Sequence, residues 1–439
     1  NLPDVPLKVI EACLLPEHAS NNLNSEVVKR ITELKEIPLQ NLPFGQFAKE
    51  ILNKIVPLMF HNLLPYLLTS RVAISKTHEL FSEENEDVKK QLDFLDRSLP
   101  GNVTIEMGLE LYNLSLLLDQ NINSVEQLED SLRQKTVSPA FIQAWDRFLT
   151  LYGFRGPREI DIDTSRFRDK PEFLLQQIIQ LKQINDPENN PLAIFQRSQR
   201  ERHQAYEYLA EISDKKGWIQ SKKFNTLYKI IETFGGIRET PKYYLIMAID
   251  LIRQRVLFEA EKLVQAGRLT NHKQVFDITI QDLSNAINDP LLDLNTIISE
   301  RRLYLDKILN IKEFPRVIDS RGKILRRPVP PVKEGEISGQ PISSGIITGP
   351  VKVLHTPDEK PLLPGDILVA HATDPGWTPL FVNASAILLE VGGMLQHGAL
   401  VAREYGKPCI AGLEHITEVL KDGMIIEVDG STGIIKILQ

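Results

Sequence analysis

Apolar residues recur every three or four positions from the start of the chain to about residue 315, which is the spacing of one helix face. Phe47, Ile51, Ile55 and Met59 illustrate the pattern. Helices are predicted over residues 27–34, 47–59, 87–99, 104–118, 172–184, 194–212, 223–233, 241–266 and 291–309. No repeat period accompanies them, so we expect an irregular all-α domain and not a solenoid.

Two helix starts carry specific capping signals. Ser124-Val-Glu-Gln127 has the spacing of a capping box, in which the Ser and Gln side chains each accept from a backbone N–H near the helix start. Ser138-Pro139 places a capping residue directly before a proline at the first helical position.

The pattern changes across residues 326–335, where several prolines disfavour helix and predict a stiff, extended linker. Beyond it, short apolar runs punctuated by glycine predict strands. These runs cover residues 346–354, 366–370, 386–389, 409–411, 424–428 and 434–438. Helical patterns are few there: around Pro379, after His397 and over 414–420. We therefore expect a multidomain chain: a helical domain (1–325), the linker and a small α/β domain (336–439).

Composition narrows the function classes. The net charge of −7 argues against a nucleic-acid partner, and no run of 18 apolar residues indicates a membrane span. Cys13 and Cys409 are too few and too far apart for a disulfide framework or a metal motif, so a reducing cytoplasm is expected. Residues 336–439 hold 12 Asp/Glu against 6 Lys/Arg. Such an acidic unit fits docking on basic surfaces, although ordinary solubility explains the charge equally well.

The stretch from Glu390 to Gly406 is the strongest candidate for chemistry. A predicted strand leads through glycines to His397, and a short helix follows. Free N–H groups and the helix dipole favour an anion at such a helix start, and neutral imidazole is a competent nucleophile. His397 is thus a candidate phosphoryl carrier, although most single histidines do no chemistry.

Two loops between the predicted helices are rich in charge. In Tyr152-Gly-Phe-Arg-Gly-Pro-Arg-Glu-Ile-Asp-Ile162, Arg155 and Glu159 belong either to an anion-binding rim or to an ion-pair network that fixes the loop. In Gly235-Gly-Ile-Arg-Glu-Thr-Pro-Lys242, Arg238 and Lys242 are four residues apart near a helix start. Two cations at that spacing form either a phosphate clamp or a solvated helix face.

The stretch Gly392-Gly-Met-Leu-Gln-His-Gly-Ala-Leu-Val-Ala-Arg-Glu-Tyr-Gly-Lys-Pro408 resembles the phosphohistidine signature of the phosphoenolpyruvate-utilising enzymes. Thr373-Asp-Pro-Gly-Trp-Thr-Pro-Leu-Phe381 resembles the preceding segment in the rifampicin phosphotransferase branch, and Asp429-Gly-Ser-Thr-Gly433 resembles the closing turn of the domain. The two charged loops resemble blocks of the family's helical domain. The chain departs from the pattern at Gln396, where family members usually have Ser or Thr.

The resemblance implies a swivelling β/β/α domain that carries a phosphoryl group on His397. It implies phosphate or substrate contacts from four residues near the histidine: Gly393, Gln396, Gly398 and Arg403. Thr373 and Asp374 are implied to bind there too, close to His397. The helical domain is implied to contribute Arg155, Glu159, Arg238 and Lys242.

The resemblance also implies an ATP-dependent dikinase-type phosphotransferase whose helical domain binds a small hydroxyl acceptor. No Gly-rich phosphate loop with a matching lysine is evident, so we expect an ATP-binding (ATP-grasp) domain upstream or in trans. ATP and Mg²⁺ are expected to bind there, with no metal or cofactor bound tightly by this chain. The alternatives are a phosphoenolpyruvate synthase-like protein with another acceptor, or a non-catalytic binding partner that retains the fold.

Overall fold

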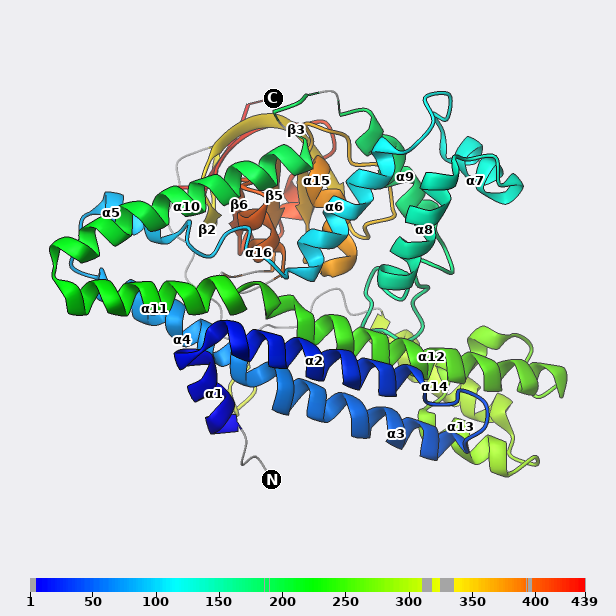
Figure 1. The fold of residues 1–439 in the computed structure, drawn as a ribbon. Helices are drawn as coiled ribbons and strands as arrows, with labels where there is room; N and C mark the ends of the chain where they lie inside the picture. Colours follow the sequence, from blue (N-terminus) through cyan, green and yellow to red (C-terminus); the bar gives the residue numbers. More distant parts are fainter. Residues whose placement is uncertain are drawn as a thin grey trace.

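A computed structural model of the chain describes residues 5–184, 186–188, 190–309, 318–323, 335–391, 393 and 397–438. Helices fill the described part up to residue 309, and strands begin at residue 336 (Figure 1). This confirms a helical region followed by a small mixed α/β region. The expected linker, 326–335, lies outside the described residues except for its last residue.

The helical region is built from fourteen described α-helices, with one π-helix and two 3₁₀ helices between them. They are α1 (Val5–Leu14), α2 (Pro16–Lys35), α3 (Phe44–Pro57), η1 (Leu58–Leu63), α4 (Leu64–Leu80), α5 (Glu86–Leu92), α6 (Val103–Leu116), α7 (Val125–Gln134), α8 (Pro139–Tyr152), α9 (Glu172–Lys182), α10 (Pro191–Lys215), α11 (Trp218–Phe234), η2 (Gly236–Glu239), α12 (Thr240–Gln265), η3 (His272–Asp277), α13 (Ile280–Asn288) and α14 (Leu294–Leu309). Both capping serines are confirmed: Ser124 accepts from Gln127 N–H, and Ser138 accepts from Phe141 N–H. The predicted capping box is formed only in part, because the Gln127 side chain accepts from Asn123 N–H and not from Ser124 N–H.

One predicted helix, residues 87–99, was too long. Helix α5 ends at Leu92, and the chain continues through turns to Pro100. Ser98 has a φ of 47°, in the left-handed region that a non-glycine residue rarely adopts. Arg202 holds this turn by donating to the carbonyls of Arg97 (3.1 Å) and Ser98 (2.5 Å). The tertiary contact from α10 therefore overrides the local helical pattern.

The π-helix η1 lies between Pro57 and Pro65. Proline has no N–H, so Pro65 leaves the carbonyl of His61, four residues earlier, without its helical donor. Lys8 Nζ donates to this carbonyl at 3.0 Å. The irregular turn is thus stabilised by a lysine from α1.

The continuous helical segment Phe44–Leu80 is long and apolar enough to cross a membrane, judged by length and composition alone. Its most apolar stretch of 18 residues has a mean hydropathy of 1.2, and 39% of that stretch is buried in the structure. The sequence analysis expected no such segment. Core helices of globular proteins also meet this criterion, and here Tyr66 stacks on Phe234 of α11 with ring centroids 5.1 Å apart. The segment packs within the helical region.

The carboxy-terminal region contains one eight-stranded mixed sheet, in the order β1-β8-β7-β3-β4-β5-β6-β2. The strands are β1 (Glu336–Ser338), β2 (Gln340–Ser343), β3 (Ile346–Leu354), β4 (Ile367–Ala370), β5 (Ala386–Leu389), β6 (Cys409–Ala411), β7 (Ile425–Asp429) and β8 (Ile434–Ile437). Strands β3 to β6 run parallel, and the other pairs are antiparallel. The parallel strands β4, β5 and β6 are buried throughout, as expected when both sheet faces are covered.

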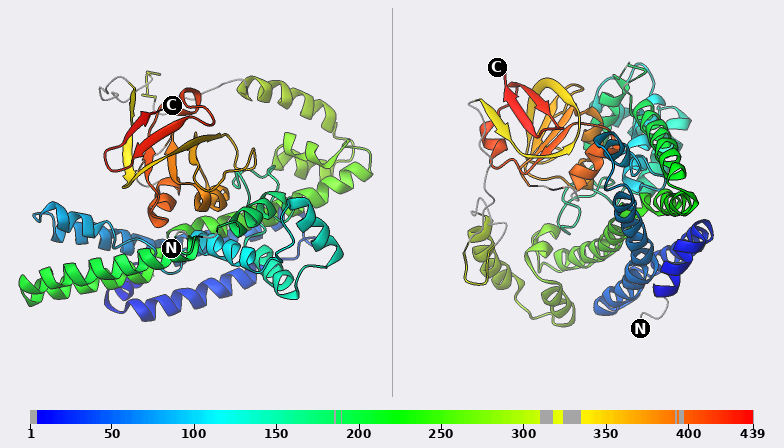
Figure 2. Two further views of the ribbon diagram at one scale, coloured as in Figure 1. Left: turned by 90° about the horizontal axis from the view of Figure 1, so that it is seen from above. Right: turned by 90° about the vertical axis from the view of Figure 1, so that its left-hand side faces the viewer.

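Three short α-helices accompany the sheet: α15 (Thr378–Asn383), α16 (His397–Glu404) and α17 (Ile416–Val419), with the 3₁₀ turn η4 (Pro375–Trp377) before α15. The sheet unit lies on one side of the helical region (Figure 2). Helix α15 contacts α6 and α9, and one apolar core cluster contains buried side chains from both regions. The two regions are therefore packed together and not merely linked.

Candidate functional site

Helix α16 begins at His397 and follows the buried strand β5. It contacts β2, β5 and β6, so its amino terminus lies near the carboxyl end of β5. The backbone of His397 forms the first position of this helix. The predicted histidine at a helix start is confirmed at the level of secondary structure.

The residue after His397 has no room for a side chain. A Cβ atom at Gly398 would lie 2.3 Å from Thr373 Oγ1 and 2.8 Å from a methyl carbon of Leu389. The Thr373 hydroxyl therefore lies against the first turn of α16. This hydroxyl is buried and has no hydrogen-bond partner among the described residues. It is a polar group available to a ligand at the helix start.

Asp374 connects this helix start to the helical region. Its Oδ2 accepts a hydrogen bond from the backbone N–H of Arg158 at 2.9 Å, and its Oδ1 accepts from Gly376 N–H at 2.8 Å. Gly376 approaches Gly156 so closely that a Cβ atom there would lie 2.5 Å from the Gly156 carbonyl oxygen. Two stretches singled out in the sequence, around residues 156 and 374, thus lie in direct contact.

Arg155 and Glu159 form a buried, two-bond ion pair, with Nε to Oε2 at 2.8 Å and Nη2 to Oε1 at 2.9 Å. Burial opposes the charge of Arg155, but the Glu159 carboxylate outweighs it and raises the pKa of the guanidinium. Both side chains are at most 1% exposed, so here the pair supports the loop from inside. Lys242 Nζ lies 3.6 Å from Glu159 Oε1 and extends this network.

Arg238 lies in η2 and Lys242 in the first turn of α12. The two predicted cations have different neighbours: Lys242 faces Glu159, whereas Arg238 Nη2 lies 2.7 Å from Oε1 of Glu404, the last residue of α16. Arg403 precedes Glu404. Burial lowers the pKa of Arg71 most, the charge of Arg238 lowers it further, and the charge of Arg403 makes a smaller contribution in the same direction. Arg403 is therefore close to this interdomain cluster.

Gly393 is partly buried. A Cβ atom added at this residue would have Gln340 Oε1 as its nearest neighbour, at 3.9 Å. Gln396 lies outside the described residues, so its proposed phosphate contact stays a prediction. Among the described residues, no group of three His, Cys, Asp or Glu side chains is placed to hold a metal ion.

Sequence analysis missed a polar cluster beside the same loop. His371 Nδ1 and Glu390 Oε2 are 2.6 Å apart, and Glu390 Oε1 accepts from Thr417 N–H at 2.9 Å and from its hydroxyl at 2.5 Å. Burial opposes ionisation of Glu390, but the bonds from Thr417 and His371 outweigh it and lower its pKa. His371 and Glu390 each follow a parallel strand, β4 and β5, and this position was the available signal.

Comparison with known proteins shows two family domains. Residues 61–239 match the rifampicin phosphotransferase fourth domain, and residues 362–433 match the mobile domain of PEP-utilising enzymes. The chain is 31% identical over 413 residues to rifampicin phosphotransferase of Bacillus subtilis, covering 89% of this chain and 46% of that protein. It is 33% identical over 367 residues to the enzyme of the same name in Bacillus cereus, covering 80% and 41%.

An uncharacterized phosphotransferase of Bacillus subtilis, YvkC, is 28% identical over 340 residues, with 74% of this chain and 40% of that protein covered. The chain thus spans less than half the length of these relatives. The first match lies within the helical region and the second within the sheet region. The chain belongs to the phosphoenolpyruvate-utilising enzyme family and is related over most of its length to the rifampicin phosphotransferases.

Proposed function

We propose that this chain is the acceptor-binding and carrier part of an ATP-dependent phosphotransferase, in which His397 carries the phosphoryl group to a hydroxyl acceptor. One observation supports this most directly. Thr373 and Asp374 lie between the first turn of α16 and the loop of Arg158. Stretches more than 200 residues apart in sequence therefore meet at the helix that begins with His397.

The chemistry requires three displacements at phosphorus. In one, a ring nitrogen of His397 forms an N–P bond to the β-phosphorus of ATP while the α–β anhydride bond breaks and AMP leaves. In another, water takes the γ-phosphate as orthophosphate, which breaks the β–γ anhydride bond. In the last, the acceptor oxygen attacks the phosphorus on His397, the N–P bond breaks and the hydroxyl proton is released. The N–H groups at the start of α16 favour the negative phosphoryl group, and we assign the Thr373 hydroxyl, which lies against the first turn of this helix, as a donor to it.

Of the two predicted cations, Lys242 supplies positive charge on the helical side, because Arg238 is paired with Glu404. In the proposed reaction, Lys242 is held near the site by Glu159 and neutralises charge on the transferring group. The relatives' name implies that they act on rifampicin; for this chain we propose only a small hydroxyl acceptor of the same broad class. We assign ATP and Mg²⁺ to an ATP-binding domain that acts with this chain, in cis or in trans.

The test combines the chain with the ATP-binding part of the Bacillus subtilis relative, Mg²⁺ and ATP labelled at the β-phosphate. Wild type should acquire acid-labile, base-stable label, and His397→Ala should acquire none. Thr373→Val keeps the shape of the side chain and should label at least about tenfold more slowly, because a charge-assisted hydrogen bond is lost. An unlabelled wild type beside an ATP-binding part shown to hydrolyse ATP would refute the proposal and favour a non-catalytic binding role.

A further inference from the structure

Glu404 is a buried carboxylate of the sheet unit, and the described partners of its two oxygens, Ser98 and Arg238, both belong to the helical region. Burial raises the pKa of this carboxyl, although the charge of Arg238 and the Ser98 N–H bond act to lower it. Ser98 N–H donates to Oε2 at 2.5 Å, and Arg238 Nη2 lies 2.7 Å from Oε1. The side chain of Glu404 is 2% exposed and that of Arg238 is 9% exposed. A carboxylate buried this deeply is destabilising unless its partners are in place.

The helical region forms a slot for this carboxylate. Ser98 holds its left-handed backbone conformation because Arg202 binds its carbonyl, and this turn presents the Ser98 N–H to Glu404. On the other side, η2 is held against the same loop, since a Cβ atom at Gly236 would lie 1.9 Å from the Pro100 carbonyl oxygen. Backbone contacts thus hold the loop of Ser98 and the turn that bears Arg238 against each other.

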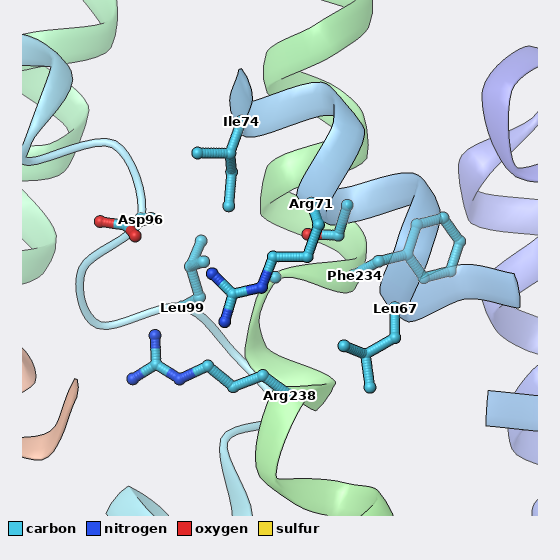
Figure 3. A pocket seen from close by; sticks show the side chains of 9 residues that line it. Leu67, Arg71, Ile74, Asp96, Leu99, Phe234 and Arg238 are labelled. Carbon is cyan, nitrogen blue, oxygen red and sulfur yellow. The ribbon is translucent and has the colours of Figure 1, made fainter. Parts of the chain in front are cut away.

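The slot carries excess positive charge. Figure 3 shows the guanidinium groups of Arg71 and Arg238 directed to the same side, toward the loop that bears Asp96. Burial lowers the pKa of Arg71, and the charge of Arg238 lowers it further. The cavity between these residues has a volume of about 10 Å³, room for about one water molecule and not for a substrate. This cavity beside Arg238 is therefore too small for a substrate, and the Glu404 carboxylate is the group that Arg238 pairs with.

We propose that Glu404 is the docking residue of the carrier domain: its carboxylate enters the slot formed by Ser98 and Arg238 and fixes helix α16 on the helical domain. Because His397 begins the same helix, fixing its last residue also sets the position of its first. The acidic carrier domain and the basic slot are complementary in charge. Docking follows from the contacts alone, whereas the role of Glu404 in positioning His397 for transfer rests on the proposed function.

The distance between the two regions tests docking without any nucleotide. Spin labels are placed on Leu68→Cys in α4 and Val419→Cys in α17, both about half exposed, in a Cys13→Ser background. Wild type should give one narrow distance distribution. Glu404→Ala and Glu404→Gln should broaden this distance distribution. The ratio of docked to undocked molecules should fall by about tenfold or more. The matched control is Glu418→Gln, in the same domain but 76% exposed, which should match wild type.

Two further variants keep the test decisive. Arg238→Gln should also loosen docking, and the double variant Arg238→Gln/Glu404→Gln should be no looser than the worse single variant, because both remove one interaction. Additive losses, or a narrow distribution in a folded Glu404→Ala protein, would overturn the proposal. In the labelling assay, Glu404→Gln should slow transfer from His397 to the acceptor while His397 still acquires label. Absence of label in wild type would count against the proposed function and leave the distance result unaffected.

Discussion

The ion pair of Arg155 and Glu159 is buried in the loop that touches the sheet region through Arg158. Removing one partner leaves the other charge buried and unpaired, which is far more destabilising than losing an exposed pair. The pair has the same i,i+4 spacing as the exposed pair of Glu211 and Lys215, so the chain provides its own control.

Glu159→Gln should lower the free energy of unfolding by roughly 3–5 kcal/mol, measured by urea denaturation. Glu211→Gln should leave it unchanged within error, because both side chains of that pair are about two thirds exposed or more. Equal effects of the two substitutions would contradict the assignment of Arg155 and Glu159 as a structural pair.

Lys407 follows α16, and its Nζ donates to the Val382 carbonyl at 3.4 Å. Burial lowers the pKa of this lysine from 10.5 to about 8, with a further contribution from Arg197. Below pH 8 the lysine is protonated in both the folded and unfolded states, and the full cost of burying its charge is present. Between pH 8 and 10.5 the unfolded state binds more protons, so stability rises with pH.

Lys407→Met should therefore be more stable than wild type at pH 7 by roughly 3 kcal/mol, the equivalent of the pKa shift. The difference should shrink as the pH rises from 8 to 10.5. Denaturation of both proteins at matched pH values checks this, because other titrating groups cancel in the difference. A difference that stays constant over this range would refute the lowered pKa.

At the scale of elements, α6 meets the residue that follows α16, Tyr405, at a glycine. A Cβ atom at Gly108 in α6 would lie 2.2 Å from Tyr405 Oη and 3.5 Å from Cζ. The Tyr405 hydroxyl is buried and has no hydrogen-bond partner in the described part of the chain. The absence of a side chain at residue 108 therefore lets the two regions pack closely at this point.

Gly108→Ala should stabilise α6 itself by roughly 1 kcal/mol through helix propensity, but weaken docking through the clash with Tyr405. The spin-label distances should broaden, and Tyr405→Phe should restore the narrow distribution by removing the clashing oxygen. Gly45→Ala in α3 is the control, because nothing lies within 4 Å of its added Cβ. Broadening that Tyr405→Phe fails to reverse would show that the clash lies elsewhere.

Element periodicity in the sequence predicted most helices and the inner strands. Strands β3, β5 and β6 occupy the expected residues. The apolar run of β6 lies directly between Pro408 and Gly412, that of β3 begins after Gly345, and that of β5 lies between the polar residues Ser385 and Glu390. Strands β1 and β2 were missed, since three or four residues of mixed polarity carry no periodic signal. The helix expected over 87–99 ended early because Arg202, more than 100 residues away, holds the turn at Ser98.

At the scale of the whole molecule, the sequence identified the stretches that approach the His397 helix but not all their partners. Arg155 and Glu159 could be weighed as a pair because they are four residues apart. The pairing of Arg238 with Glu404 could not, since 166 positions separate them and only the docking of two regions joins them. Motifs therefore indicated the candidate chemistry, whereas only tertiary packing revealed the ion pair that joins the two regions.

The central claim is that His397, and no other histidine, carries the phosphoryl group. The sharpest rival is His371, which is exposed, lies beside the same loop and contacts Glu390. The decisive measurement is mass-spectrometric mapping of the phosphorylated residue, at neutral pH, after reaction with ATP, Mg²⁺ and the ATP-binding part of a relative. The account predicts phosphate on the peptide at His397, unchanged in His371→Gln and absent in His397→Ala. Phosphate on His371, or phosphorylation that persists in His397→Ala, would contradict it.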